Sequence, residues 1–168
     1  MTGTLVRIEP WDKGDLPLLK KTLGDPEMTR YVGGPESDKK LAERQERFER
    51  LPEAGTGQMF KIVDEATGEA VGSVGYWDQT RGGDDIYEMG WFVIPEYQGR
   101  GVASAATSLA IDRMRAERKH ESVHAFPSIE NDASNALCKK LGFTFVKEVH
   151  FEYPPGHYMR GNDWRLDL

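Results

Sequence analysis

The segment Ile86–Ala110, IYEMGWFVIPEYQGRGVASAATSLA, contains the strongest structural signals in the chain. Its beginning is rich in aromatic and β-branched side chains, which predicts a strand over Ile86–Ile94. Pro95 has no backbone N–H for a sheet, so we expect the strand to end there. Gly90 lies inside the strand, where a lone glycine predicts a bulge or the close approach of another backbone.

The second half of this segment predicts a glycine-containing turn that leads directly into a helix. Gly99 and Gly101 can adopt backbone angles that residues with a Cβ resist. Apolar residues then recur at helical spacing over Val102–Arg118. The first turn of a helix has free N–H groups and a partial positive charge, which suits a phosphate or pyrophosphate. A tight turn without a ligand is the alternative that the turn by itself leaves open.

Two familiar phosphate-binding patterns are absent from the sequence. There is no G-x-x-x-x-G-K-[ST] P-loop. A dinucleotide-binding fold requires G-x-G-x-x-G early in a βαβ unit, but here Gly99-Arg100-Gly101 is followed by Ser104 in place of the third glycine, past the middle of the chain. A nucleotide-binding fold of either kind is therefore disfavoured.

Three motifs, in order along the chain, resemble the GNAT superfamily of N-acetyltransferases. The sequence from Gly90 to Gly101, GWFVIPEYQGRG, is similar to that of the branch that acetylates the N-termini of ribosomal proteins. This branch also contains small-molecule acetyltransferases. The other two motifs are Gln98-x-x-Gly101-x-Ala103, which is similar to the family signature Q/R-x-x-G-x-G/A, and Asn131-x-x-Ser134-Asn135-Ala136-Leu137 followed by Lys140-Leu141-Gly142-Phe143. The resemblance covers nearly the whole chain.

Composition is that of an ordinary soluble domain. The 168 residues suggest one domain, 1–168, with 38% hydrophobic and 30% charged residues. No apolar run approaches the ~20 residues that span a bilayer, and the N-terminus lacks the apolar core of a signal peptide, so we expect a cytoplasmic protein with no membrane partner. Cys138 is the only cysteine, which excludes an internal disulfide and a cysteine-based metal cluster, and we expect no metal ion.

The chain is acidic, with a net charge of −6 and a pI near 5.3. A general nucleic-acid-binding protein normally carries a basic face, so we expect no nucleic-acid partner. The acidic balance fits a cationic or amine acceptor, but only weakly. An anionic cofactor would need local positive potential from the helix N-terminus and from Arg100.

The predicted elements follow the order β-α-α-β-β-β-α-β-α-β-β, which is also the GNAT order. This order indicates an α/β domain with a mixed, mostly antiparallel seven-stranded sheet and about four helices. Strands are expected over Leu5–Trp11, Met59–Asp64, Glu69–Asp78, Ile86–Ile94, Ser122–Phe126, Phe143–Tyr153 and Asp163–Leu168, and helices over Leu16–Leu23, Ser37–Leu51, Val102–Arg118 and Asn131–Leu141. Turns or irregular connections are expected over Leu51–Gly57, Trp77–Asp84 and Tyr153–Asn162.

The resemblance implies that the chain binds acetyl-CoA and transfers its acetyl group directly to a primary amine, through a tetrahedral intermediate. The amine would be a protein N-terminus or a small molecule. The pantetheine arm would pair like an added strand with Trp91, Phe92 and Val93, a backbone N–H at the bulge would stabilise the oxyanion, and Asn131 would contact the arm. Backbone N–H groups would hold the pyrophosphate, from Gln98, Gly99, Arg100, Gly101, Val102 and Ala103.

Glu88 is the candidate general base, directly or through water, because the amine must attack in its neutral form. At pH 7 roughly one α-amine in ten is neutral, against fewer than one lysine amine in a thousand, so an N-terminal acceptor needs less help. The alternative for Glu88 is an exposed or ion-paired acid. His124, on the short strand opposite, is the alternative base, although a lone histidine is more often a hydrogen-bonded structural residue.

The tyrosine with which many GNAT enzymes protonate the departing thiolate is replaced by Cys138, which we interpret as a core thiol. Ser134 lies at the position that resembles the serine proposed for this role in the ribosomal-protein branch. Asn131 and Ser134 can equally be ordinary helix caps. The missing tyrosine leaves a non-catalytic module, which senses acyl-CoA or binds a partner, as the alternative function.

Acceptor recognition is expected in two loops, Asp25–Pro35 and Glu152–Asn162. Tyr31 is the candidate acceptor-binding residue, because its ring can stack on a substrate and its hydroxyl can form a hydrogen bond. A plain connector is the alternative for the first loop. The family resemblance also makes a homodimer an expectation.

Overall fold

The computed structural model describes residues 3–152 and 155–168. Among these residues, seven strands form one sheet in the order β1-β2-β3-β4-β5-β7-β6. Neighbouring strands are antiparallel except β4 and β5, which run parallel, so the predicted fold class is confirmed. The strands are β1 Val6–Pro10, β2 Gly57–Asp64, β3 Ala70–Arg81, β4 Asp84–Val93, β5 Ser122–Ala125, β6 Thr144–Glu152 and β7 Tyr158–Asp167.

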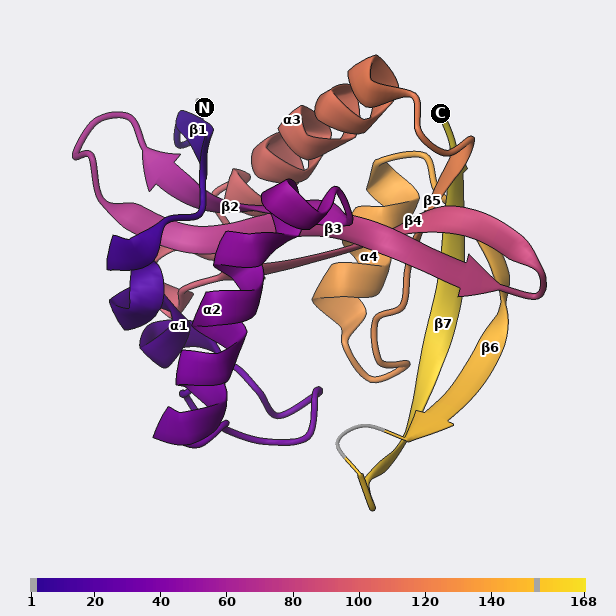
Figure 1. Ribbon diagram of the computed structural model, residues 1–168, viewed down its shortest axis with the longest axis horizontal. Coiled ribbons are helices and arrows are strands. Elements are labelled where there is room, and N and C mark those ends of the chain that lie inside the picture. The colour runs from indigo at the N-terminus through magenta and orange to yellow at the C-terminus, as the bar shows by residue number, and fades with distance from the viewer. Residues whose placement is uncertain (1–2, 153–154) are drawn as a thin grey trace.

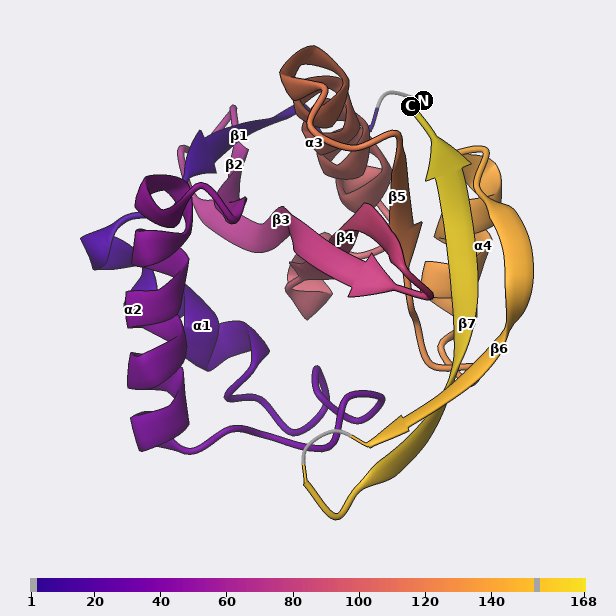
Figure 2. The same ribbon diagram turned by 45° about the vertical axis from the view of Figure 1, so that its right-hand side comes forward.

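Four α-helices accompany the sheet in the described part of the chain. They are α1 Leu16–Thr22, α2 Asp38–Ala54, α3 Val102–Glu117 and α4 Asp132–Lys140, with short 3-10 turns η1 Lys13–Asp15 and η2 Pro95–Tyr97. α3 lies on one side of the sheet, while α1 and α2 lie on the other (Figures 1 and 2). α4 lies beside β7 and β6 in both views.

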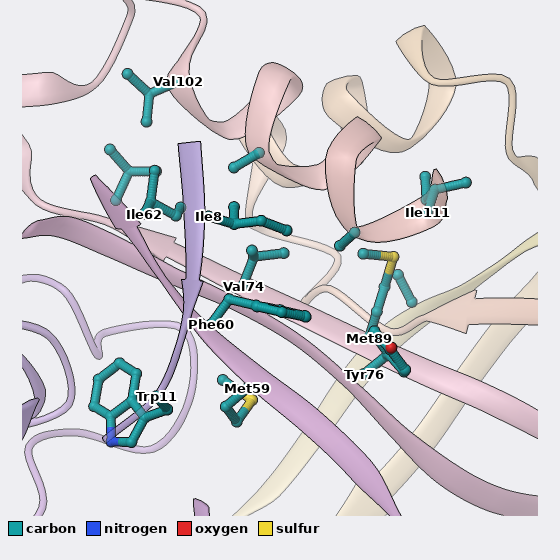
Figure 3. Close-up of a cluster of buried hydrophobic side chains, with 14 of the residues drawn as sticks. Ile8, Trp11, Met59, Phe60, Ile62, Val74, Tyr76, Met89, Val102 and Ile111 are labelled. Atoms are coloured by element: carbon teal, nitrogen blue, oxygen red, sulfur yellow. The ribbon is translucent and has the colours of Figure 1, made fainter. Parts of the chain in front are cut away.

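Buried apolar side chains lie on both sides of the sheet (Figure 3). Val102 and Ile111 of α3 face the strands from one side, and Trp11 lies with Met59 on the other side. Trp11 also fixes α2, because its Nε1 donates to Oε1 of Gln45 at 2.8 Å. Full burial of a large aliphatic side chain contributes about 1.5–3 kcal/mol, so these two layers hold the helices against the sheet.

The connection from β4 to α3 has the form that the sequence predicted. β4 ends at Val93, and Pro95 begins η2. Gly101 then caps α3 with φ of 77°, in the left-handed region where a side chain with a Cβ is strained. The residues of α3 that recur at helical spacing, Val102, Ala106, Ala110 and Met114, are buried against the sheet.

β4 and β5 form a fork, because they pair over two residues and then separate. The paired positions are Tyr87 with Val123 and Glu88 with His124. From Met89 to Val93, β4 pairs with β3 and has no ladder partner on its other edge among the described residues. Figure 1 shows the two strands running in clearly different directions beyond the paired residues. The fork therefore leaves the backbone of β4 open on one edge.

The bulge expected at Gly90 is wrong for the ladder between β3 and β4. Their register runs without a shift from Gly72 opposite Val93 to Arg81 opposite Asp84. Gly90 lies opposite Gly75, and a Cβ on Gly90 would meet the Trp77 ring at 3.4 Å. A Cβ here would thus make an ordinary contact with a side chain, and the irregularity of β4 lies on its β5 side, at the fork.

Three predicted element boundaries are also wrong, those of α2, β3 and β7. α2 continues through Pro52 to Ala54, because a proline in the last turn removes only one hydrogen bond and Gly55 then provides the left-handed cap. β3 continues to Arg81 and is joined to β4 by Gly82 and Gly83, both with positive φ, as a tight hairpin requires. The polar residues of Trp77–Asp84 predicted a turn, but most of them belong to a regular ladder between β3 and β4.

β7 begins at Tyr158 instead of Asp163. Its first half pairs with β6, with His150 opposite Arg160 and Glu152 opposite Tyr158. Arg160 also binds the Glu148 carboxylate with Nη2–Oε1 of 2.8 Å. Residues 153 and 154, where β6 was expected to end, lie outside the described residues. The pairing of β6 with β7, which no local pattern reveals, decides this boundary.

Candidate active site

Glu88 is the last residue of β4 that pairs with β5, so it lies directly before the fork. It is flanked by Trp77 of β3 and His124 of β5. The preceding residue, Tyr87, faces the end of α3, because its hydroxyl accepts a hydrogen bond from the Lys119 N–H at 3.0 Å. Side chains alternate along a strand, so Glu88 projects from the opposite face of the sheet.

The Glu88 carboxyl group is partly buried and has an unusual pKa. Burial is the largest effect and raises this pKa above its ordinary value. A weak hydrogen bond from Gln79, with Nε2–Oε1 of 3.5 Å, and the charge of Arg81 act in the opposite direction. A carboxylate with a raised pKa holds a proton more strongly, as a general base must. This environment differs from the exposed acid that the sequence left open.

His124 lies beside Glu88 and is itself held by Asp163. Its Nδ1 is 2.6 Å from Oδ1 of Asp163 on β7, and both side chains are buried. The ring also stacks on Phe126, with 5.9 Å between centroids. The two residues that sequence reasoning proposed as alternative bases are therefore neighbours, and Asp163 completes the cluster.

The turn before α3 presents backbone N–H groups without side-chain caps. Gly101 is the N-cap residue, and no side chain of the described chain accepts from the first turn of α3. Gly99 and Gly101 have φ of 72° and 77°, and a Cβ at either position would meet nothing within 4 Å. Val102 is buried, and Ala103 is partly buried against the core. The turn is therefore an open cradle of N–H groups at the positive end of a helix dipole, which fits a pyrophosphate.

Two side chains of this turn hold it in place. Gln98 donates from Nε2 to the carbonyl of Val93 at 2.9 Å, which ties the turn to the end of β4. Arg100 donates from Nε to Oγ1 of Thr4 at 3.0 Å, and its guanidinium lies 4.4 Å from the centroid of the Tyr97 ring. The Arg100 side chain is thus directed toward the N-terminal segment.

The open edge of β4 presents alternate peptide groups. The Ile94 N–H bonds to the Val71 carbonyl, so the even-numbered residues of this stretch face β3 and the odd-numbered residues face the fork. Trp91 and Val93 therefore direct peptide groups into the fork, whereas those of Phe92 face β3. Gln98 already occupies the Val93 carbonyl. An added strand would find its partners at Trp91 and at the N–H of Val93.

The start of α4 lies across the fork from β4. Nε1 of Trp91 donates to Oγ of Ser134 at 3.3 Å. An oxygen that accepts this bond keeps its own O–H free to donate, so Ser134 has a hydroxyl proton available at the fork. The structure brings Ser134 to the strand that also carries Glu88.

Asn131 is the N-cap of α4, since its Oδ1 accepts from the Ser134 N–H at 3.1 Å. Asn135, in the same motif, has a structural role that the sequence did not predict. Its Oδ1 accepts from Asn162 at 2.9 Å and from Trp164 at 2.8 Å, so it fixes α4 to β7. The cap interpretation of Asn131 is thus confirmed, while its contact with a cofactor stays a prediction.

Cys138 is fully buried, and burial raises the pKa of its thiol to about 12. A thiol in this state is protonated at neutral pH and is a poor nucleophile. The structure confirms Cys138 as a core residue.

Tyr31 lies in the loop between α1 and α2 and contacts Arg30. Its hydroxyl accepts from Nη2 of Arg30 at 2.9 Å, and the guanidinium also lies 4.7 Å from its ring centroid. Nε2 of Gln98 lies 3.6 Å from Sδ of Met28, so this loop reaches the turn before α3. The loop also lies near the described end of the β6–β7 hairpin in both views (Figures 1 and 2). The two predicted specificity segments are therefore neighbours.

The described residues, 3–152 and 155–168, lack two kinds of feature. No group of three or more His, Cys, Asp or Glu side chains is placed to hold a metal ion in this part of the chain. No helix within the same residues is long and apolar enough to cross a membrane.

Sequence reasoning missed Gln79, Asp163 and Asn135 as members of the site. Gln79 was placed in a turn, and Asp163 lies 39 residues from His124. Only the pairing of the strands brings these side chains together. Asn135 was part of a motif, but its partners lie on β7, which was expected to begin after Asn162.

The sequence matches the family model of the acetyltransferase (GNAT) domain over residues 6–144. Comparison with curated proteins gave no match. Several solved structures share the fold. A ribosomal L7/L12 alpha-N-protein acetyltransferase in complex with coenzyme A has a TM-score of 0.82 at 17% identity, covering 100% of this chain and 97% of that one.

Two further structures have other acceptors in their names. A spermidine N-acetyltransferase from Vibrio cholerae, in complex with coenzyme A and spermine, has a TM-score of 0.80 at 17% identity, covering 96% of this chain and 95% of its own. A ribosomal-protein-S5-alanine acetyltransferase from Vibrio fischeri has a TM-score of 0.74 at 20% identity, covering 99% and 94%. At these identities the likeness is one of fold.

Proposed function

Because the chain belongs to the GNAT acetyltransferase family, we propose that it transfers the acetyl group of acetyl-CoA directly to a primary amine. Solved structures of the same fold include complexes with coenzyme A, which supports acetyl-CoA as the donor. Their names include both protein N-termini and a polyamine as acceptors, so either kind of amine fits the fold.

The donor site extends from the turn before α3 to the fork. The N–H groups of Gly99–Ala103 would bind the pyrophosphate, with Gly99 and Gly101 leaving room for it, whereas the Gln98 N–H already donates to the Pro95 carbonyl at 3.2 Å. The peptide group of Trp91 faces the fork, where it would pair with the pantetheine arm. Acetyl-CoA supplies an activated thioester carbonyl. The acidic net charge of the chain is offset locally by the helix dipole, while Arg100 is engaged with Thr4 and Tyr97.

The observation that carries the proposal is the position of Glu88. It is the last paired residue of β4, at the point where the strand opens toward the proposed donor site. Its raised pKa makes it a stronger proton acceptor than an ordinary carboxylate. Glu88 therefore takes one proton of the acceptor ammonium. Ser134 donates its hydroxyl proton to the departing thiolate and regains a proton from the one that the nitrogen loses on forming the amide.

Substitution Glu88→Gln tests this assignment. The amide keeps the size of the side chain but cannot accept the amine proton, so kcat should fall about 100-fold or more, within the range for general acid–base catalysis. The dissociation constant of acetyl-CoA should stay within about twofold. Both quantities are measured with an acceptor found by screening peptides and small amines for release of coenzyme A.

Three results are possible in this experiment. A large loss of kcat at constant acetyl-CoA affinity supports Glu88 as the base. Full activity of the variant contradicts that role. Tight acetyl-CoA binding by the wild-type protein without turnover of any amine would favour a non-catalytic acyl-CoA-sensing module.

A further inference from the structure

The His124–Asp163 pair is a second acid–base group beside the proposed base. Glu88 and His124 occupy paired positions on β4 and β5, and the charge of His124 acts on the Glu88 carboxyl group. Asp163 lies on the other side of His124, with Oδ1 at 2.6 Å from Nδ1. The three groups thus lie in a row across β4, β5 and β7.

Asp163 decides which nitrogen of His124 exchanges protons. A carboxylate only accepts hydrogen bonds, so Nδ1 must carry a proton and donate a hydrogen bond to Oδ1. In the neutral ring, Nε2 is then a free acceptor. A proton added to Nε2 creates an imidazolium whose charge is balanced by the buried Asp163 carboxylate.

His124 also connects this row to solvent. An open cavity of about 960 Å³ lies between the β3–β4 hairpin, the start of β5 and strands β6 and β7. His124 and Asp163 line it, together with Arg81, Lys147 and Arg165. His124 lines this cavity and Glu88 does not, so His124 is the member of the pair that contacts the cavity.

We propose that His124, positioned by Asp163, carries the proton of the acceptor ammonium from Glu88 to water in this cavity. The inference rests on the proposed function and adds the exit route of the proton. A protein amine is mostly protonated at neutral pH, so a proton must leave before the amine can attack. Without an exit route, Glu88 would stay protonated and could not accept the proton of the next acceptor.

The protons balance in three transfers. The ammonium group gives one proton to the Glu88 carboxylate and becomes the neutral nucleophile. The Glu88 carboxylic acid gives the proton to Nε2 of His124, directly or through one water, and returns to carboxylate. The imidazolium releases the proton to water in the cavity. No other bond forms or breaks in these transfers.

Nitrogen NMR of the uniformly 15N-labelled 168-residue chain tests the arrangement without any donor or acceptor. The chain has 4 histidines, so the His124 signals are identified by their loss in His124→Gln. The proposal predicts the Nδ1–H tautomer in the wild-type protein. In Asp163→Asn the amide can donate to Nδ1, so the Nε2–H tautomer should appear. Observation of Nε2–H in the wild-type protein, or no change in Asp163→Asn, overturns the proposal.

The same spectra test the coupling to Glu88. Its carboxyl group is one of several charged groups around the ring, with Arg81, Asp163, Arg165 and Lys147 as the others. The pH dependence of the His124 signals should change in Glu88→Gln, because the carboxyl group beside the ring is then absent. His150→Gln is the matched control, because His150 lines the same cavity but is exposed and paired with Glu148. A titration that Glu88→Gln leaves unchanged overturns the proposal.

Kinetics distinguish a proton route from a structural role. Turnover of a primary alkylamine, measured as release of coenzyme A from pH 6 to 9, should fall at least tenfold in His124→Gln and Asp163→Asn. Added imidazole should restore part of it in His124→Gly, while acetyl-CoA affinity stays constant. Equal turnover of wild-type and His124→Gln across this pH range overturns the inference. Failure of acetyl-CoA binding would instead remove the proposed function, without affecting the NMR result.

Discussion

Glu88 is held in an environment that favours its protonated form. Burial raises the pKa of this carboxyl group above the value of about 4.5 expected when it is exposed, so the folded state binds a proton that the unfolded state releases. Between the two pKa values the folded protein carries more protons, and stability falls as pH rises. Above the folded-state pKa the penalty is complete. The buried carboxylate of the proposed base thus lowers the stability of the fold at the pH where the base works.

The substitution Glu88→Gln should therefore not lower stability at pH 8. Because the amide has no charge to bury, the variant should melt at the same temperature as the wild-type protein or higher, and the difference should shrink toward pH 4. Thermal unfolding at both pH values, followed by circular dichroism, measures this. A variant that melts lower at pH 8 but not at pH 4 would show that the carboxylate forms a stabilising interaction, contrary to the account.

Trp91 orients the hydroxyl group of Ser134 by donating to its oxygen. Substitution Trp91→Phe removes the N–H and keeps an aromatic ring. The loss of one hydrogen bond of about 1 kcal/mol corresponds to roughly fivefold in kcat if the bond acts in the transition state. The steady-state rate with saturating acetyl-CoA gives this value.

Trp164→Phe provides the comparison for this variant. Its indole N–H donates to Asn135, on the same helix as Ser134, at 2.8 Å. This control should lower stability without a comparable loss of kcat. Unchanged kcat in both Trp91→Phe and Ser134→Ala would exclude Ser134 as the proton donor to the thiolate.

At the level of elements, the turn before α3 determines whether the cofactor can bind. Gly101 has φ of 77° and open space beside it, so a side chain at this position is strained and projects into the proposed pyrophosphate site. Gly101→Val should lower acetyl-CoA affinity at least 100-fold, measured by titration calorimetry.

Gly55→Val is a matched control for backbone strain. Gly55 caps α2 with φ of 69°, and a Cβ there would also meet nothing within 4 Å. Both variants should lose a similar amount of stability, about 1–2 kcal/mol. Only Gly101→Val should lose acetyl-CoA binding. Equal affinities of the two variants would place the pyrophosphate elsewhere.

The order of elements was predictable because each long element has a local signal. The aromatic and β-branched residues of β4, the glycine turn and the start of the helical spacing of α3 all lie within one stretch of 25 residues, Ile86–Ala110. Boundaries that depend on pairing were not predictable. The second half of β3 is polar but forms a ladder with β4 across Gly82-Gly83, and β7 begins where β6 provides a partner.

The site was predictable to a similar degree. Motif residues such as Glu88, Gly101 and Ser134 could be chosen from one sequence, because the resemblance identifies their positions. Gln79 and Asp163 could not, because their roles depend on strands that meet only in the folded sheet. Local sequence patterns also could not predict that the Arg100 side chain is directed toward Thr4.

At the scale of the whole molecule, the sheet consists of two parts that meet at the fork. β1 to β4 form one part, and β5, β7 and β6 form the other, and the parts share two paired positions between β4 and β5. A ligand held by the turn before α3 and by the open edge of β4 would contact the region where the parts separate. Its binding should therefore stabilise the whole fold.

Thermal unfolding in the presence of acetyl-CoA, coenzyme A, NAD and ATP tests whether the chain binds coenzyme A. Ligand at about 100 times its dissociation constant adds ~2.7 kcal/mol to the free energy of unfolding, a rise of about 5–10 °C in Tm for a chain of this size. We predict such a rise with acetyl-CoA and coenzyme A alone. No rise with either compound, or a larger rise with NAD or ATP, would contradict a coenzyme A site at Gln98–Ala103 and the acetyl transfer that depends on it.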